Sequence, residues 1–267
     1  MKRRVPALFL LVFAVVAMAA DRIPGQPVYL EEMTWTEVRD AIAAGRTTVI
    51  LPVGGTEQNG PHMVLGKHNV RVHVLAGRIA AQLGNALVAP VVSYVPEGRI
   101  DPPAGHMRFP GTISVPDDAF KAVVEGAARS FRHAGFRDVV LIGDHGGYQG
   151  DLAAVAAKLD REWAADAASV HFVPEYYRSS ADAYGRILRE HGIGAAQIGS
   201  HAGTADTSLA LAVDPALVRA DRLGAAPTAG DGIAGDPRPS TAALGQLGVD
   251  LIVARTVAAI RRAVVAR

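Results

Sequence analysis

Cysteine is absent from all 267 residues of this chain. Its absence excludes disulfides, thiol nucleophiles and zinc sites built from thiolates. The chain also has no long run of like charge and a formal net charge of only +1, so nothing in its composition favours nucleic acid as a partner. Neither a Gly-x-x-x-x-Gly-Lys-Ser/Thr phosphate loop nor a Gly-x-Ser-x-Gly nucleophile elbow occurs, and a serine hydrolase is therefore disfavoured.

The N-terminus carries the pattern of a secretory signal peptide. Three cations at positions 2–4 precede an apolar run over 7–16, and Ala-Met-Ala at 17–19 supplies a small-x-small cleavage site. The apolar run is too short for a comfortable membrane span, and an uncleaved anchor is the alternative. We predict a signal peptide over residues 1–19, export to the periplasm of a Gram-negative host, and no stable membrane association after cleavage.

Strands and helices are expected to alternate along the rest of the chain. Apolar runs predict strands over residues 47–53, 86–95, 138–143 and 170–176. Helical spacing, caps and glycine stops predict helices over 34–44, 70–83, 116–133, from after Gly147 to about 168, and over 179–191, 204–213 and 241–266. Such alternation builds a mostly parallel sheet covered on both faces. With no interdomain linker in the sequence, residues 20–267 are predicted to form one three-layer α/β/α domain.

Polar side chains cluster after three of these predicted strands. The candidates in the three loops are Glu57, Asn59, His62, His68, His106 and His145. In open α/β sheets, sites form beyond the carboxyl ends of the strands, so we expect these loops to meet at one edge. Taken singly, each residue reads as a solvated loop side chain or a histidine bonded to backbone. Taken together, they suggest one metal-dependent hydrolytic site.

A fourth segment joins this group. Gly199-Ser-His-Ala-Gly203 places His201 just before a helix whose first turn carries Asp206. Glycines on both sides of a histidine allow close approach of backbone to a ligand. We therefore include His201 and Asp206 among the candidate site residues.

Four motifs make a resemblance specific. Leu51-Pro-Val-Gly-x-Thr-Glu-Gln-x-Gly-Pro-His62, Phe109-Pro-Gly-Thr-Ile-Ser114, Gly143-x-His-Gly-Gly147 and His201-Ala-Gly-x-x-x-Thr-Ser208 resemble, in order, the signatures of the creatininase (creatinine amidohydrolase) family. The resemblance implies a three-layer α/β/α fold and hydrolysis of C–N amide bonds in small, often cyclic substrates. It also implies one or two divalent metals and a homo-oligomer, often a hexamer.

The resemblance also carries residue roles. Glu57 matches a metal-ligand glutamate and His145 a metal-ligand histidine, while His201 resembles a histidine that handles protons near the scissile bond. Two positions in the first loop depart from the family pattern. Asn59 stands where the family has a histidine, and His68 stands where it has an aspartate that bridges two metals.

Two further departures lie in later motifs. Gly147 stands two residues after the metal-binding histidine, where creatininase itself has a glutamate, and Asp206 shortens a family glutamate. A carboxylate can bridge two cations, whereas a neutral imidazole offers one lone pair to one metal. The exchanges at positions 59, 68 and 147 therefore favour one ion over two.

We predict a single ion, most naturally zinc with manganese or iron as alternatives, bound by Glu57, His68 and His145. Asp206 would be a fourth ligand or the base for water, and His201 would protonate the leaving nitrogen. The residues expected to orient ligands or line the pocket are Asn59, His62, His106, Gly146, Gly147 and Tyr148.

Two alternatives stay open. Within the family, Asp206 and Asn59 could assemble a second metal position. In a different class, the chain could be a non-catalytic periplasmic protein that binds a metal or small molecule. The glycine-rich segment 230–236 reads as a solvent loop, with a mobile lid or a subunit contact as the other readings.

Overall fold

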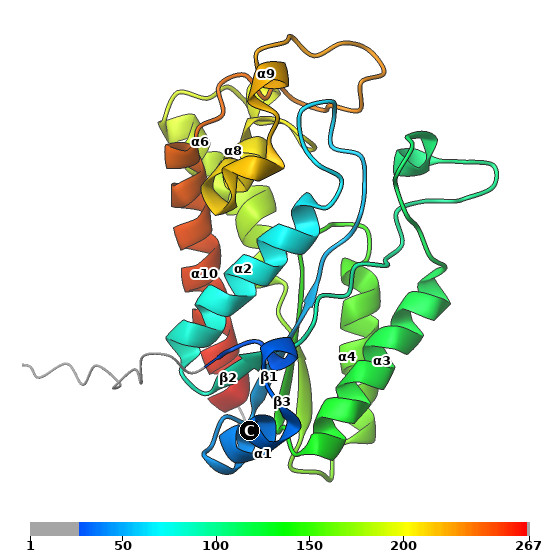
Figure 1. Ribbon diagram of the computed structural model, residues 1–267, viewed down its shortest axis with the longest axis vertical. Coiled ribbons are helices and arrows are strands. Elements are labelled where there is room, and N and C mark those ends of the chain that lie inside the picture. The colour runs from blue at the N-terminus through cyan, green and yellow to red at the C-terminus, as the bar shows by residue number, and fades with distance from the viewer. Residues whose placement is uncertain (1–26, 266–267) are drawn as a thin grey trace, which may run out of the picture.

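A four-stranded parallel sheet lies at the centre of the fold in the computed structural model, which describes residues 27–265 (Figure 1). The strands are β1 (Thr48–Val53), β2 (Ala86–Val88), β3 (Asp138–Gly143) and β4 (Ser169–Phe172). Their order across the sheet is β2-β1-β3-β4, and every neighbouring pair is parallel. The predicted fold class is confirmed. The predicted signal peptide lies outside the described residues.

Helices connect the strands and cover both faces of the sheet. The longer ones are α1 (Trp35–Ala43), α2 (Lys67–Leu83), α3 (Asp117–Ala134), α4 (Gln149–Glu162), α6 (Tyr184–Glu190), α8 (Thr204–Val213) and α10 (Ala242–Val265). The short ones are η1 (Leu30–Glu32), η2 (Gly105–Arg108), α5 (Glu175–Arg178), the π-helical turn η3 (Ser179–Ala183), α7 (Ala195–Ile198), η4 (Pro215–Leu217) and α9 (Ala220–Leu223). The expected capping box at the start of α1, between Thr34 and Glu37, is present.

Alternating side chains of the strands supply two separate cores. Ile50 of β1 and Val140 of β3 point to the face covered by α2 and α10, whereas Val49 and Leu51 point to the face of α3 and α4. Each of these side chains is at most 2% exposed. Burying one aliphatic side chain of this size contributes about 1.5–3 kcal/mol. Burial on both faces explains why the strands read as unbroken apolar runs.

Several predicted boundaries are wrong, each for a local reason. β2 ends at Val88 rather than at 95, because Pro90 has no N–H for the ladder and only Val92 returns to bridge Val53. β4 ends at Phe172, and Pro174 then precedes α5. The helix predicted over 179–191 opens with a π-helical turn, and α4 stops at residue 162.

The start of α2 matters most for the site. The helix begins at Lys67, three residues before the predicted start, and ends at Gly84 in the left-handed conformation with φ 83°. Lys67, His68 and Arg71 therefore belong to its first two turns. Residues three or four apart share one face of a helix, so these long polar side chains project together.

Helix α10 packs against the other helices of its face. Within residues 27–265 it is long and apolar enough to cross a membrane by length and composition alone, and half of its most apolar window is buried. It contacts α8 and α2 along its length. A core helix meets the same criterion, and the contacts of α10 are those of a core helix.

The close approach of α10 to α8 gives a stability prediction. A Cβ added to Gly245 would overlap the backbone carbonyl of Ser208, whereas one added to Gly126 on the exposed side of α3 would meet nothing within 4 Å. We expect Gly245→Ala to lose about 1–3 kcal/mol through overpacking. Gly126→Ala should gain up to about 1 kcal/mol from helix propensity. Urea unfolding of both variants checks this, and shifts of the same sign would contradict the packing argument.

Candidate metal centre

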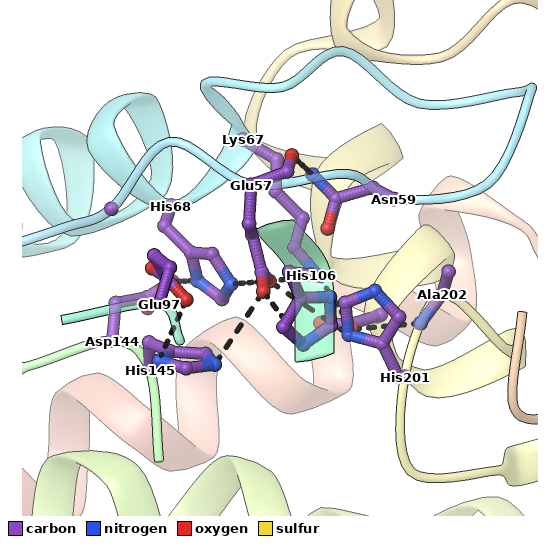
Figure 2. Close-up of polar contacts among 12 residues, drawn as sticks. Glu57, Asn59, Lys67, His68, Glu97, His106, Asp144, His145, His201 and Ala202 are labelled. Atoms are coloured by element: carbon purple, nitrogen blue, oxygen red, sulfur yellow. Dashed lines mark hydrogen bonds and ion pairs between the residues drawn. The ribbon is translucent and has the colours of Figure 1, made fainter. Parts of the chain in front are cut away.

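Side chains from four segments meet around a cavity of about 310 Å³ beyond the carboxyl ends of β1 and β3. The predicted site residues that line it are Glu57, His68, His106, His145, Gly146, His201 and Asp206. Figure 2 shows Glu57 at the centre of this group, with histidines around it. The expected convergence of the four loops is thus present in the structure.

Glu57 is fully buried and contacts most of the other groups. Its Oε1 lies 2.7 Å from His68 Nε2 and 3.8 Å from His201 Nδ1. Its Oε2 lies 3.2 Å from His106 Nε2 and 3.5 Å from His145 Nε2, yet has no hydrogen-bond partner. Burial alone would raise the pKa of Glu57, but the hydrogen bond from His68 and the charges of His68 and Lys67 together hold it well below its ordinary value.

His68 bridges two carboxylates. Its Nε2 faces Glu57 Oε1, and its Nδ1 lies 2.5 Å from Asp144 Oδ2. An imidazole donates from both nitrogens only when both carry a hydrogen. In this arrangement both nitrogens of His68 face carboxylate oxygens, and the ligand role of His68 stays a prediction.

Asp206 is likewise engaged by cations. Lys67 Nζ lies 2.6 Å from its Oδ2, and Arg71 Nη1 lies 2.9 Å from its Oδ1. Burial would raise the pKa of Asp206, but the charges of Lys67 and Arg71 outweigh that effect and hold it well below its ordinary value. Arg71 also reaches Asp144 Oδ2 at 2.7 Å. Asp206 thus lies in an ion-pair network with Lys67 and Arg71, and its role as a fourth ligand or a base stays a prediction.

Glu97 is a site residue that sequence reasoning missed. It lies in the loop after β2, is 4% exposed, and neither carboxylate oxygen has a hydrogen-bond partner. Its Oε2 lies 3.5 Å from His145 Nδ1. Burial, and then the charge of Glu57, raise the pKa of Glu97 to about 9. The sequence signal that could have identified it was its position, two residues after the strand predicted over 86–95.

Two groups of three residues each present ligand atoms that lie within 4.8 Å of one another. One is Glu57, Glu97 and His145, and the other is Glu57, His106 and His201. The two groups share Glu57. Carboxylate oxygens and imidazole nitrogens are the donors that zinc and manganese accept in proteins. Buried carboxylate oxygens without partners therefore fit a divalent cation.

Two histidines near Glu57, His145 and His201, are expected to be neutral. Burial lowers the pKa of both His145 and His201 to about 4, and the charge of Lys67 adds to the effect at His201. His201 Nε2 lies 2.9 Å from the carbonyl oxygen of Gln58, which can only accept, so Nε2 carries the hydrogen. The lone pair of His201 Nδ1 then faces the cavity beside Glu57.

With this geometry in place, comparison with known proteins identifies the family. A family model described as creatininase, creatinine amidohydrolase, matches residues 31–260. The chain belongs to the creatininase family. A creatinine amidohydrolase of Pseudomonas putida is 30% identical over 201 residues, which cover 73% of this chain and 75% of that protein. A mycofactocin precursor peptide peptidase of Mycolicibacterium smegmatis is 32% identical over 222 residues, which cover 74% of this chain and 78% of that protein.

Two solved structures show how closely the creatininase fold is kept. A manganese creatininase is similar with a TM-score of 0.75 and 26% identity, covering 90% of this chain and 100% of that one. A Zn–Zn form of a creatininase variant is similar with a TM-score of 0.72 and 25% identity, again covering 90% of this chain and 100% of that one. The predicted family, fold class and class of enzyme, a metal-dependent amidohydrolase, are confirmed.

The remaining predicted residues of this creatininase-family site brace it from outside the cavity. Asn59 Nδ2 donates to the carbonyl oxygens of Glu57 and Val64, and His62 Nε2 lies 3.0 Å from Thr207 Oγ1. The Tyr148 hydroxyl is buried, where it accepts the N–H groups of residues 144 and 145. These three side chains hold the loops in place and do not line the cavity.

The two glycines after His145 are needed for close contacts. A Cβ on Gly146 would meet Tyr177 Oη at 2.5 Å, and one on Gly147 would crowd the ring of His145 at 3.0 Å. The Gly147 N–H donates to His145 Nδ1 at 3.2 Å. The Gly-Gly pair therefore fixes the ring of His145 and keeps the space beside it free.

The shifted pKa values predict how stability depends on pH when no metal is bound. Between pH 6.5 and 4 the unfolded chain protonates His145 and His201 while the folded chain does not, so stability falls as the pH falls. Glu97 opposes this, because its folded form holds a proton that the unfolded chain releases above about pH 4.5. The unfolded chain gains two protons at the histidines and lacks one at Glu97, a net difference of about one proton. The free energy of unfolding should therefore fall by about 1.4 kcal/mol for each unit by which the pH falls.

Urea unfolding of chelator-treated protein at pH 6.5, 5.5 and 4.5 measures this slope. The Glu97→Gln variant removes the opposing group, so its slope should be about twice as steep. An unfolding midpoint that stays constant over this range would contradict the assignment of neutral, buried histidines.

Proposed function

We propose that this protein hydrolyses a C–N amide bond in a small molecule with the help of one divalent ion held at Glu57. The observation that carries the proposal is the buried Glu57 carboxylate. Its Oε2 has no hydrogen-bond partner and lies 3.2 Å from His106 Nε2 and 3.5 Å from His145 Nε2. The creatininase relatives, one of them a manganese form, support the same chemistry.

Glu57 and His145 are the two residues that would hold the ion. Both were predicted as ligands, and His145 is expected to be neutral, which is the form that binds metals. Zinc is our first expectation, with manganese or iron as alternatives. We favour one ion because His68 already contacts Glu57 Oε1, which leaves Oε2 as the carboxylate oxygen without a hydrogen bond. One similar structure is a manganese form and another is a Zn–Zn form. Elemental analysis of the mature protein tests which metal binds and how many ions each chain holds.

A divalent ion bound here would polarise the amide carbonyl and make water a better nucleophile at neutral pH. His201 would accept a proton from the attacking water at Nδ1, which faces Glu57 Oε1 at 3.8 Å, and return it to the leaving nitrogen. Because its pKa is low, the ring of His201 is neutral at pH 7 and its Nδ1 is free to accept this proton. Lys67, held by Asp206, keeps a positive charge 3.9 Å from Glu57 Oε1 and so balances the buried carboxylate.

The cavity supports a small substrate. Its volume of about 310 Å³ lies at the lower end for small-molecule sites. Ile198, Ala205 and Leu209 give one part of the wall an apolar character, while Tyr177 and Ser180 supply hydroxyl groups. A compact amide, cyclic or at a peptide end, fits this lining. The relatives named for creatinine and for a precursor peptide are consistent with both choices.

A non-catalytic binding protein is the second candidate. The observation that favours it is the exchange at position 68, where an imidazole fills the place between Glu57 and Asp144. Such a protein would bind a metal or small molecule in the same cavity without turning it over. We also propose that the protein is exported with cleavage of its signal peptide, which fractionation of host cells tests. We further propose that the mature protein forms a homo-oligomer, which light scattering tests.

One experiment separates the two candidates. Metal-stripped protein is reloaded with zinc or manganese and assayed against lactams, hydantoins, creatinine and short peptides. Hydrolysis that returns with the metal and disappears in Glu57→Gln supports the enzyme. Metal binding without hydrolysis of any of these amides supports the binding protein, and absence of metal binding contradicts the metal-dependent enzyme.

A further inference from the structure

We propose that Glu97 is a further metal ligand, supplied to the Glu57–His145 site from the loop after β2. The inference rests on the proposed metal-dependent function and extends it by one residue. Glu97 and Glu57 each approach the ring of His145, one at Nδ1 and the other at Nε2, and both separations are 3.5 Å (Figure 2).

The first argument is the lack of any other partner for Glu97. Its side chain is fully buried, and neither Oε1 nor Oε2 receives a hydrogen bond. A carboxylate removed from water without a partner is strongly unfavourable, so proteins rarely keep one unless it has a cation to bind. No lysine or arginine within residues 27–265 forms an ion pair with Glu97, and its one ion-pair contact there is with His145, at 3.5 Å.

The second argument is that the fold makes room for this carboxylate. A Cβ on Gly55, whose φ is +152°, would overlap Glu97 Oε1. A Cβ on Gly147 would lie 3.0 Å from the His145 ring and 3.5 Å from the carbonyl oxygen of Pro96. Glycines on two different loops therefore keep clear the space in which Glu97 and His145 meet.

The third argument is that the backbone of Glu97 is fixed. The Ser114 hydroxyl accepts the Glu97 N–H at 3.0 Å and donates to the carbonyl oxygen of Gly98 at 2.7 Å. Ser114 closes the Phe-Pro-Gly-Thr-Ile-Ser motif, and Thr112 in the same motif accepts the N–H of Gln58. This motif thus ties the Glu97 loop to the Glu57 loop, which is a placement suited to two ligands of one ion.

Glu97 does not serve as the hydrogen-bond acceptor that orients His145. His145 Nδ1, the atom nearest to Glu97, already accepts the N–H of Gly147 at 3.2 Å. A nitrogen that accepts from a backbone N–H carries no hydrogen to give to a carboxylate. The ring of His145 is thus oriented by Gly147, and the carboxyl oxygens of Glu97 are left for a cation.

Metal binding by the full mature protein tests the proposal. Chelator-treated wild type, Glu97→Gln and the control Glu125→Gln are titrated with Zn²⁺ by calorimetry and with Co²⁺ by visible absorption. Glu125 is a matched carboxylate on α3 whose partner is Lys158 on the protein surface. Glutamine keeps the shape of Glu97 and its acceptor oxygen, but it removes the charge.

We expect Glu97→Gln to weaken Zn²⁺ binding by at least about 100-fold and to change the Co²⁺ spectrum, because changes outside the direct ligand shell reach only about 10–100-fold. Glu125→Gln should bind like wild type. Unchanged affinity, or weaker binding with an unchanged Co²⁺ spectrum, would overturn the ligand role. If wild type binds and hydrolyses amides in that case, only this inference fails. If wild type binds no metal, the proposed function fails with it.

Discussion

Glu57→Gln is expected to lower amide hydrolysis by at least about 1,000-fold, equivalent to roughly 4 kcal/mol of activation free energy. Glu57 is the residue that both candidate groups of metal ligands share, and its Oε2 is the unpartnered atom that faces His145. Glutamine has nearly the same shape, so the cavity should persist. Its neutral amide binds a divalent cation poorly, and the ion is lost along with the charge.

Steady-state rates with the best amide found, together with metal analysis after gel filtration, measure this effect. Circular dichroism shows whether the variant is folded, since His68 and Lys67 lose a charged partner. Glu162→Gln, a change in an exposed pair with Arg129, is the matched control and should behave like wild type. A Glu57→Gln variant that keeps its activity within about tenfold would place the chemistry elsewhere.

Arg71→Met is expected to cost about 3–5 kcal/mol of unfolding free energy. Arg71 is 3% exposed and joins Asp144, at 2.7 Å, to Asp206, at 2.9 Å. Methionine fills similar space but leaves two carboxylates without their shared cation. Breaking one partner out of a buried charge network costs far more than breaking an exposed pair. At about 2–4 °C per kcal/mol, the melting temperature should fall by about 6–20 °C.

Thermal and urea unfolding of Arg71→Met beside Arg129→Met checks this prediction. Arg129 pairs with Glu162 at the surface, where both side chains are about 40% exposed, so its loss should stay within about 1 kcal/mol. Equal destabilisation by the two arginine variants would show that the buried network contributes no more than a surface pair.

Much of the fold followed from local patterns in the sequence. The runs at 47–53 and 138–143 are apolar on both faces, and only a sheet covered on both sides buries them. Loops beyond such strands then meet at one edge, which is why Glu57 and His145 could be named in advance as neighbours. The predicted strand ends were wrong at prolines such as Pro90. A proline ends the hydrogen-bonded pairing of a strand without ending the apolar run in the sequence.

The electrostatics of the site could not be predicted in the same way. Lys67 and Arg71 were missed because the glycine and polar residues before Val70 read as loop, whereas α2 already begins at Lys67. Once these cations are on the helix face, they pair with Asp206, and His68 pairs with Asp144. Such pairs join residues more than 70 positions apart, so no spacing rule reveals them.

Glu97 was missed for a related reason. It lies among prolines and glycines, where a single acid reads as a solvated loop residue. The hydrogen bond from its N–H to the Ser114 hydroxyl, between residues 17 positions apart, helps to fix this loop in the fold. Burial of an acid without a partner is a property of the folded chain, and it is the property that points to a metal.

The most direct test of the account is a metal titration of the stripped mature protein in which bound Zn²⁺ and amide hydrolysis are measured on the same samples. We predict that one equivalent binds tightly, that activity rises in proportion and levels off at that equivalent, and that Glu57→Gln regains neither. Activity that needs a second equivalent would contradict the single-ion site. Full activity in stripped protein, or its persistence in Glu57→Gln, would contradict metal-dependent hydrolysis at Glu57.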